Sequence, residues 1–248
     1  AAREAGLFTS VVALDRFGAD DVASAFDHFS SLAAEAIVVI APVDSLAEAV
    51  ASQGASVPVV AVSGGRTFGR GVSVVHADQR GGACALAKHL MALGHRDIAC
   101  VAGPQEWFEA RERVAGWREA MDQAGLPKRA PLVGSWEARW GYVAGQNLVE
   151  DGLPDAVMCA NDEVAVGLLR AFAEARVSVP GDVSVAGFDD VPMAAYAGPG
   201  LTTVRQDFAD LGRCALEAVS RALDGETVDT YVRPTRLVVR GSTGVCPR

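Results

Sequence analysis

Residues 89–104 read HLMALGHRDIACVAGP, and residues 111–117 read RERVAGW. The first stretch has the pattern of a helix end, a tight turn at Gly94, and a short apolar run, Ile98–Ala102, that is typical of a buried strand. The second stretch continues into another helix, which opens with two arginines. Helix, turn, strand and helix in this order predict one βαβ unit of a parallel sheet.

The same alternation continues on both sides of this unit. Short apolar strand patterns alternate with longer helical patterns, and a glycine-rich stretch, residues 63–71, separates an earlier series from a later one. This alternation predicts an α/β fold, and two successive doubly wound units are its simplest account. The predicted strands are 8–14, 36–40, 58–62, 98–102, 132–133, 156–160 and 183–186, and the predicted helices are 20–34, 45–53, 81–93, 109–124, 138–150, 163–175 and 207–223.

Composition and charge narrow the function classes. The chain has 248 residues, of which 50% are hydrophobic, enough to bury a large core. It carries 22 Lys+Arg against 31 Asp+Glu, a formal net charge of −9, and no block of five or more basic residues. Because such a surface repels a duplex, the chain by itself is predicted to be a poor DNA binder.

The cysteines and the apolar runs indicate where in the cell the protein is expected. The five cysteines are dispersed, with no C-x-x-C pair and no histidine at metal-ligand spacing, so no metal site and no cofactor is predicted. Unpaired cysteines fit a reducing cytoplasm. No apolar run approaches the roughly 18 residues of a membrane span, and the N-terminal residues lack a signal peptide's apolar core. We therefore expect a cytoplasmic protein without membrane contact.

Polar residues stand where three of the predicted strands end. Arg113 lies near the start of the helix after strand 98–102, Asn161 and Asp162 follow a later strand, and Asp189 follows the next one. Open α/β sheets bind ligands at the carboxyl ends of their strands, where guanidinium and carboxylate groups suit vicinal hydroxyls. Simpler alternatives stay open: solvated ion pairs, helix caps and a capped turn.

Several motifs follow one another in a fixed order along nearly the whole chain, and together they are similar to the LacI/GalR family of bacterial transcription regulators. The most specific match is PGDVSVAGFDD at residues 180–190. The other matches are the stretch quoted first, RERVAGW, Asn161-Asp162, PGLTTVRQD at residues 199–207 and RLVVRGST at residues 236–243.

The resemblance implies a periplasmic-binding-protein-like fold of type I, in which two Rossmann-like lobes with parallel sheets enclose a ligand cleft. The expected first lobe comprises residues 1–77 and 208–235, and the expected second lobe comprises residues 78–207 and 236–248. Residues 1–6 have the pattern of a helix end. We therefore expect the family's first strand, usually central, to be missing from this chain and to leave a gap in the sheet.

The resemblance also implies which residues contact the ligand. It favours ligand contacts for Arg113 and Asp189, and it adds an effector-facing role to the caps Asn161 and Asp162. It places Trp136 at a position that often lines the pocket. An aromatic face at that position can stack on the C–H face of a pyranose ring.

Four further residues are candidates with open alternatives. Gln206 either points into the cleft or serves a hinge. Phe108 belongs to a group of aromatic residues at loops and helix starts of the second lobe, where rings fill small-molecule pockets or a core. Asp15 and Arg16 follow the strand pattern of residues 8–14 and either face the cleft from the first lobe or form a turn.

The leading hypothesis is the ligand-sensing domain of a LacI/GalR-type regulator. It binds a small effector, a sugar or sugar derivative, and shifts a two-state equilibrium. The implied partners are a second copy of the chain, held through apolar faces of helices 20–34 and 45–53, and operator DNA. The DNA would be contacted only through an N-terminal headpiece, which we do not expect within this chain.

The sequence leaves two other hypotheses. The periplasmic sugar-binding component of an ABC transporter shares this fold and is the alternative, although five unpaired cysteines argue against it. An α/β enzyme is the third. The sequence has no G-x-S-x-G elbow, no phosphate loop ending in Gly-Lys-Ser/Thr, and no histidine with a nucleophile partner by spacing, so no enzyme activity is predicted.

Overall fold

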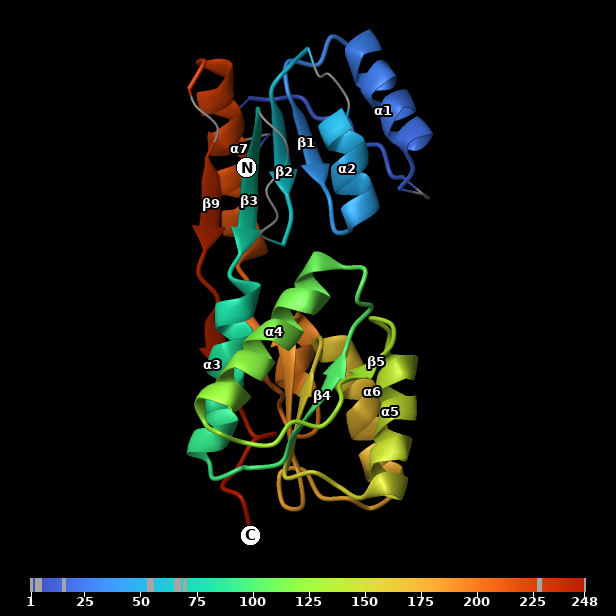
Figure 1. The fold of residues 1–248 in the computed structure, drawn as a ribbon, viewed down its shortest axis with the longest axis vertical. Helices are drawn as coiled ribbons and strands as arrows, with labels where there is room; N and C mark the ends of the chain where they lie inside the picture. Colours follow the sequence, from blue (N-terminus) through green and yellow to red (C-terminus); the bar gives the residue numbers. More distant parts are fainter. Residues whose placement is uncertain are drawn as a thin grey trace. The chain divides into compact units, whose positions relative to one another are not determined.

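The structure, a computed structural model, describes residues 2, 6–14, 17–52, 56–64, 68, 71–226 and 229–247. The chain divides into two compact units (Figure 1). Their limits differ by one or two residues from the lobe limits expected above, and Glu106–Glu109 belong to the first unit. Unit 1 comprises Ala1–Asp78, Glu106–Glu109 and Asp207–Arg233, and unit 2 comprises Gln79–Gln105, Ala110–Gln206 and Pro234–Arg248.

Unit 1 is built on a parallel sheet covered by helices on both faces. Its elements are α1 (Ala19–Ser31), β1 (Ile37–Ile40), α2 (Asp44–Ser52), β2 (Val59–Val62), β3 (Val72–Ala77), α7 (Phe208–Leu223) and β9 (Thr230–Arg233). The strand order is β1-β2-β3-β9. Because side chains alternate along a strand, Val59 and Ala61 of β2 pack with residues of α1 and α2, whereas Val60 packs with α7.

The predicted strand at residues 8–14 is wrong. Residues 7–14 are irregular, and Phe8 and Val11 are exposed. None of the strands in the described part of the chain pairs with this segment, and β1 is an edge of its sheet, where Ile40 is 73% exposed. An alternating apolar pattern forms a strand only where a neighbour can satisfy its backbone hydrogen bonds.

The apolar face of α2 lies inside unit 1. Leu46, Ala47, Ala49 and Val50 are all buried in the core beneath the sheet. The predicted role of this face, a contact between two copies of the chain, is wrong for α2, because the face packs against the sheet of its own unit.

Unit 2 contains a larger sheet with two helices on each face (Figure 1). Its elements are α3 (Gln79–Ala92), β4 (Ile98–Ala102), α4 (Phe108–Gln123), β5 (Leu132–Val133), α5 (Ala138–Asp151), β6 (Ala156–Cys159), α6 (Asp162–Glu174), β7 (Ser184–Asp189), the short helix η1 (Pro192–Tyr196), β8 (Thr202–Arg205) and β10 (Arg236–Val238). The order is β10-β8-β7-β6-β4-β5, and only β10 is antiparallel to its neighbour. Strand β7 continues three residues beyond its predicted end and so reaches Asp189.

The two faces of this sheet bury separate cores. Cys100 of β4 packs with α3 and α4, where Trp117 is fully buried. The neighbouring Val101 packs with α5 and α6 on the opposite face. The carboxyl ends of the parallel strands therefore meet at one edge of a rigid, two-sided layer.

Helices α5 and α6 approach so closely that only glycine fits at their contact. A Cβ atom on Gly167 would lie 1.8 Å from the carbonyl oxygen of Ala138. Since backbone cannot give way cheaply, Gly167→Ala should lower the free energy of unfolding by at least about 2 kcal/mol. Gly212→Ala in α7, where nothing lies within 4 Å, is the control and should be neutral or stabilising by up to about 1 kcal/mol. Urea unfolding curves measure both, and equal values for the two variants would contradict the prediction.

All five cysteines are free thiols. None of the helices in the described residues is both long and apolar enough to cross a membrane. Within the same residues, no group of three or more His, Cys, Asp or Glu side chains is arranged to hold a metal ion.

Candidate functional site

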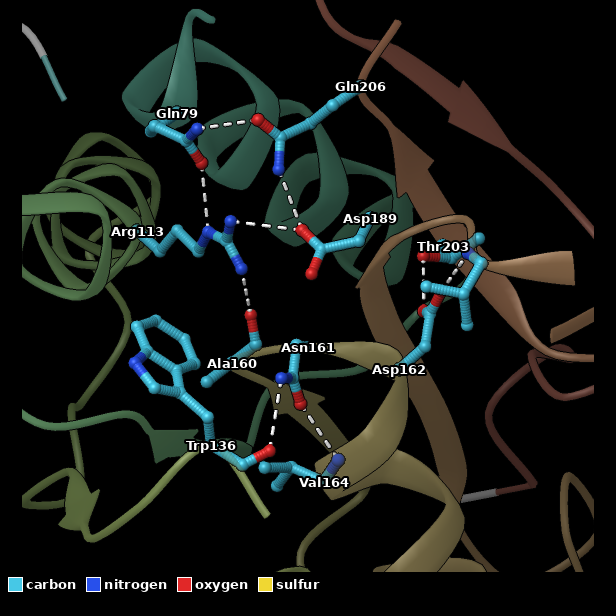
Figure 2. Close-up of polar contacts among 11 residues, drawn as sticks. Gln79, Arg113, Trp136, Ala160, Asn161, Asp162, Val164, Asp189, Thr203 and Gln206 are labelled. Atoms are coloured by element: carbon cyan, nitrogen blue, oxygen red, sulfur yellow. Dashed lines mark hydrogen bonds and ion pairs between the residues drawn. The ribbon is translucent and has the colours of Figure 1, made fainter. Parts of the chain in front are cut away.

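One connected group of polar side chains lies at the carboxyl ends of strands in the sheet of unit 2 and at the start of α3 (Figure 2). Arg113 comes from α4, which follows β4, and Asp189 is the last residue of β7. Gln206 directly follows β8, and Gln79 is the first residue of α3. Residues distant in sequence meet here because parallel strands all end at the same edge of the sheet.

Arg113 is the centre of this group. Its side chain is only 6% exposed, and three of its N–H groups donate hydrogen bonds. Nε donates to Gln79 Oε1 at 2.9 Å, Nη1 to the carbonyl oxygen of Ala160 at 2.5 Å, and Nη2 to Asp189 Oδ1 at 3.0 Å. A guanidinium has five N–H groups, so one on each terminal nitrogen is left for a ligand.

The guanidinium lies over two aromatic rings. Its central carbon is 4.0 Å from the ring centroid of Phe188 and 5.5 Å from that of Trp136. Cation–π attraction adds to the hydrogen bonds and fixes the plane of the guanidinium. The orientation of Arg113 is therefore set before any ligand arrives.

Two glutamines close the group into a ring. Gln79 Nε2 donates to Gln206 Oε1 at 2.7 Å, and Gln206 Nε2 donates to Asp189 Oδ1 at 2.7 Å. Asp189 Oδ1 thus accepts from both Arg113 and Gln206, while Oδ2 has no hydrogen-bond partner in the described part of the chain. The side chain of Asp189 is 21% exposed, so this oxygen is the acceptor that the group offers to a ligand.

Gln79 is not among the site residues predicted from the sequence. This residue is 5% exposed and links Arg113 to Gln206. The signal that could have revealed it is the rule used for the other residues, a polar side chain shortly after a strand. Strand β3, which precedes Gln79, was itself not predicted.

Asn161 and Trp136 form the next part of the site. Asn161 Oδ1 accepts from the backbone N–H of Val164 at 2.8 Å, so it is the N-cap of α6, and its Nδ2 donates to the carbonyl oxygen of Trp136 at 3.1 Å. A Cβ on Gly103 would lie 2.7 Å from the Trp136 ring, which means that the indole rests on bare backbone. The cap therefore also holds the loop that carries the indole beside Arg113.

Asp162 shares no hydrogen bond with Arg113, Asp189 or Gln206 in the described part of the chain (Figure 2). It is 1% exposed, and both carboxylate oxygens accept protein hydrogen bonds, Oδ1 from Thr203 Oγ1 and Oδ2 from the N–H of Val191. Burial raises the pKa of Asp162 to about 6, although these two donors act in the opposite direction. The structure thus gives Asp162 no surface on which a ligand could bind directly.

Three other predicted residues do not join the group. Phe108 is 4% exposed and packs in the core of unit 1, whose sheet it covers, so we do not include it in the candidate site. Asp15 and Arg16 lie outside the described residues.

The group has both hydrogen-bond donors and an acceptor that no protein atom uses among the described residues. Its free functions are two guanidinium N–H groups and one carboxylate oxygen, beside an aromatic face. The positive charge of Arg113 is balanced by Asp189 at 3.0 Å, so the group as a whole presents no net charge to a ligand.

Comparison with known proteins places this geometry in a family. Residues 87–243 match the family described as "Periplasmic binding protein-like domain". The lactose operon repressor of Escherichia coli (strain K12) is 35% identical over 158 residues, which are 63% of this chain and 44% of that protein. The chain spans about half the length of the curated relatives it matches.

Solved structures agree with this assignment. The Lac repressor dimer bound to operator and the anti-inducer ONPF superposes with a TM-score of 0.89 at 28% identity, over 98% of this chain and 85% of that one. The complex of the transcriptional regulator CelR with cellobiose has a TM-score of 0.81 at 29% identity, over 90% of this chain and 70% of that one.

These relatives are repressors and regulators and not enzymes, and they give no support to the alternative of a transporter component. The fold is the expected periplasmic-binding-protein-like one, with parallel sheets and helices on both faces. The chain therefore belongs to the periplasmic binding protein-like domain family, and the resemblance to the LacI/GalR regulators expected from its sequence is confirmed.

Proposed function

We propose that this chain senses a small, uncharged, polyhydroxylated effector, a sugar or sugar derivative, and that Arg113 and Asp189 bind its hydroxyl groups. The observation that carries this proposal is the pair of unused guanidinium N–H groups beside the unused Asp189 Oδ2. A hydroxyl group can accept from the first and donate to the second, and vicinal hydroxyls can do so together.

The surroundings of the pair favour a sugar over an anion. Asp189 already neutralises Arg113, so a phosphate or carboxylate ligand would add a negative charge that no cation of the group is free to balance. The Trp136 ring lies next to the guanidinium and is partly exposed, and an indole ring suits the C–H face of a pyranose. The complex of a related regulator with cellobiose supports the same ligand class.

For the whole protein we propose regulation of transcription through a population shift. An effector that binds one of two conformations more tightly moves the equilibrium toward it by that difference in affinity. Operator binding and a homodimer are proposed for the whole protein, supported by the relative whose dimer is bound to operator. The five free cysteines support the cytoplasm as its compartment.

The test is a thermal-shift panel with neutral sugars, including cellobiose, lactose and D-galactose, against gluconate and glucose 6-phosphate as charged controls. At a concentration of about 100 times Kd, a bound sugar adds about 2.7 kcal/mol to the unfolding free energy, a rise in Tm of roughly 5–10 °C. We expect at least one neutral sugar, and neither charged control, to raise Tm. Stabilisation by the charged compounds alone would contradict the proposal.

A further inference from the structure

The backbone around Asp189 has a conformation that ordinary residues rarely adopt. Asp189 has φ +104° and Asp190 has φ +55°, two successive positive values in residues with a Cβ atom. Such conformations persist only where surrounding contacts hold them, and they gather at functional sites. The side chain of Asp189 meets Arg113 from this strained turn, so whatever holds the turn also aims the carboxylate.

One side of the turn is held by ion pairs. Asp190 has a side chain that is 3% exposed, and it pairs with Arg205 at 2.5 Å and with Arg240 at 2.6 Å. Burial alone would raise the pKa of Asp190, but the bonds from Arg240 and Arg205 outweigh it and hold the pKa below its usual value. Asp190 is therefore an ionised anchor of the turn.

The other side of the turn is held by Asp162, from the first turn of α6. Its Oδ2 accepts the N–H of Val191, the residue after the two strained ones, at 2.8 Å. Its Oδ1 accepts from Thr203 Oγ1 of β8 at 2.5 Å. The Asp162 carboxylate thereby links Val191, which follows β7, to Thr203 of the neighbouring strand β8.

The strands make room for this carboxylate. A Cβ on Gly187 would lie 2.2 Å from Asp162 Oδ1, and Gly187 is the register partner of Thr203 in the β7–β8 pair. The carboxylate therefore docks onto the two strands at one level, where one supplies a hydroxyl donor and the other a bare backbone. No ion pair of Asp162 occurs among the residues that the structure describes, and a buried carboxylate without a cation is costly to keep.

We propose that Asp162 is a positioning residue, paired with Thr203, that locks the turn at residues 189–191 and so keeps the Asp189 carboxylate aimed at Arg113. Asp162 acts through Asp189 and does not touch the effector. The proposal rests on the proposed function for its meaning in effector binding, but the geometry of the turn can be tested without any ligand.

Three variants of the full chain separate the possibilities. Asp162→Ala removes both acceptors. Asp162→Asn is nearly isosteric and keeps both hydrogen bonds, since its amide oxygen can accept from Val191 while its NH₂ donates to Thr203 Oγ1. Thr203→Val removes only the hydroxyl donor, keeps the β-branched shape, and stands in if Asp162→Ala does not fold.

The first readout needs no ligand. Backbone NMR shifts report φ at residues 189–191, and the Nε–H signal of Arg113 reports its environment. We expect Asp162→Ala to shift both sets of signals and Thr203→Val to shift them less, while the rest of the spectrum is retained. Asp162→Asn should restore the native signals. Native signals at residues 189–191 in Asp162→Ala, or in Thr203→Val if the former is unfolded, would overturn the proposal.

The second readout uses cellobiose and the other neutral sugars of the panel. We expect Asp162→Ala to weaken binding by about tenfold and Asp162→Asn by less than about threefold. If Asp162→Asn weakens binding as much as Asp162→Ala while the turn keeps its native signals, Asp162 contacts the ligand and the proposal is wrong. If no neutral sugar binds the unmodified chain, the proposed ligand class fails, and the NMR signals alone decide the role of Asp162.

Discussion

Replacing Arg113 with methionine is expected to weaken sugar binding by at least about tenfold while the protein stays folded. The variant loses both N–H groups offered to the ligand, and hydrogen bonds to a charged group contribute about 1.5–3 kcal/mol each. Methionine is flexible and apolar and can fill the space between the rings of Phe188 and Trp136. Isothermal titration calorimetry with the sugar identified in the panel measures the loss.

The matched control is Arg118→Met, on the same helix. Arg118 is exposed, so its replacement removes the same charge without touching the site, and it should change the affinity by less than about twofold. Unchanged affinity in Arg113→Met would remove this residue from the site. An equal loss in both variants would instead point to a general effect of charge.

Replacing Asp162 with asparagine is expected to stabilise the protein at neutral pH by up to about 3 kcal/mol. The pKa of Asp162 is raised from 3.8 to about 6, so the folded protein binds this proton more tightly than the unfolded chain does. The stability from Asp162 is therefore fully present below about pH 4 and is lost as the pH rises through about 6. At about 1.36 kcal/mol per unit of pKa, the loss is about 3 kcal/mol.

The measurement is the difference in unfolding free energy between the unmodified chain and Asp162→Asn, from urea curves between about pH 3.5 and 7.5. Carboxylates with lowered pKa, such as Asp190, are present in both proteins and cancel. Glu174→Gln is the control of opposite sign, because the Tyr142 and Arg170 bonds lower the pKa of Glu174. At neutral pH, Glu174→Gln should be less stable than the unmodified chain and Asp162→Asn more stable, and both differences in unfolding free energy should shrink on acidification. An Asp162→Asn difference that does not change with pH would contradict the prediction.

These two predictions assign different roles to two residues that looked alike in the sequence. Arg113 and Asp162 both follow buried strands, and the same reasoning selected both as ligand contacts. In the structure, Arg113 donates hydrogen bonds to Asp189 and Gln79. The Asp162 carboxylate instead packs against strands β7 and β8. We therefore expect loss of binding from one substitution and gain of stability from the other.

The sequence by itself determined the alternation of elements, the two-unit architecture it implies, and the main polar residues of the site. Strands β4 and β5 have the predicted bounds, because a short apolar run between a helix stop and a new helix leaves little choice. Arg113 and Asp189 became candidates because both lie near the carboxyl ends of predicted parallel strands, and the resemblance to the LacI/GalR family then favoured a ligand contact for both.

Only the tertiary structure decided which neighbours each residue has. Gln79 belongs to the candidate site because it bonds to Gln206, 127 positions away. Asp162 does not, because Thr203 and Val191 donate hydrogen bonds to both of its carboxylate oxygens. Phe108 went to the core of unit 1, and residues 7–14 remained without a strand partner in the described chain. Periodicity records which side of an element is buried, but hydrogen-bond partners and strand neighbours come from distant segments, and no local pattern encodes them.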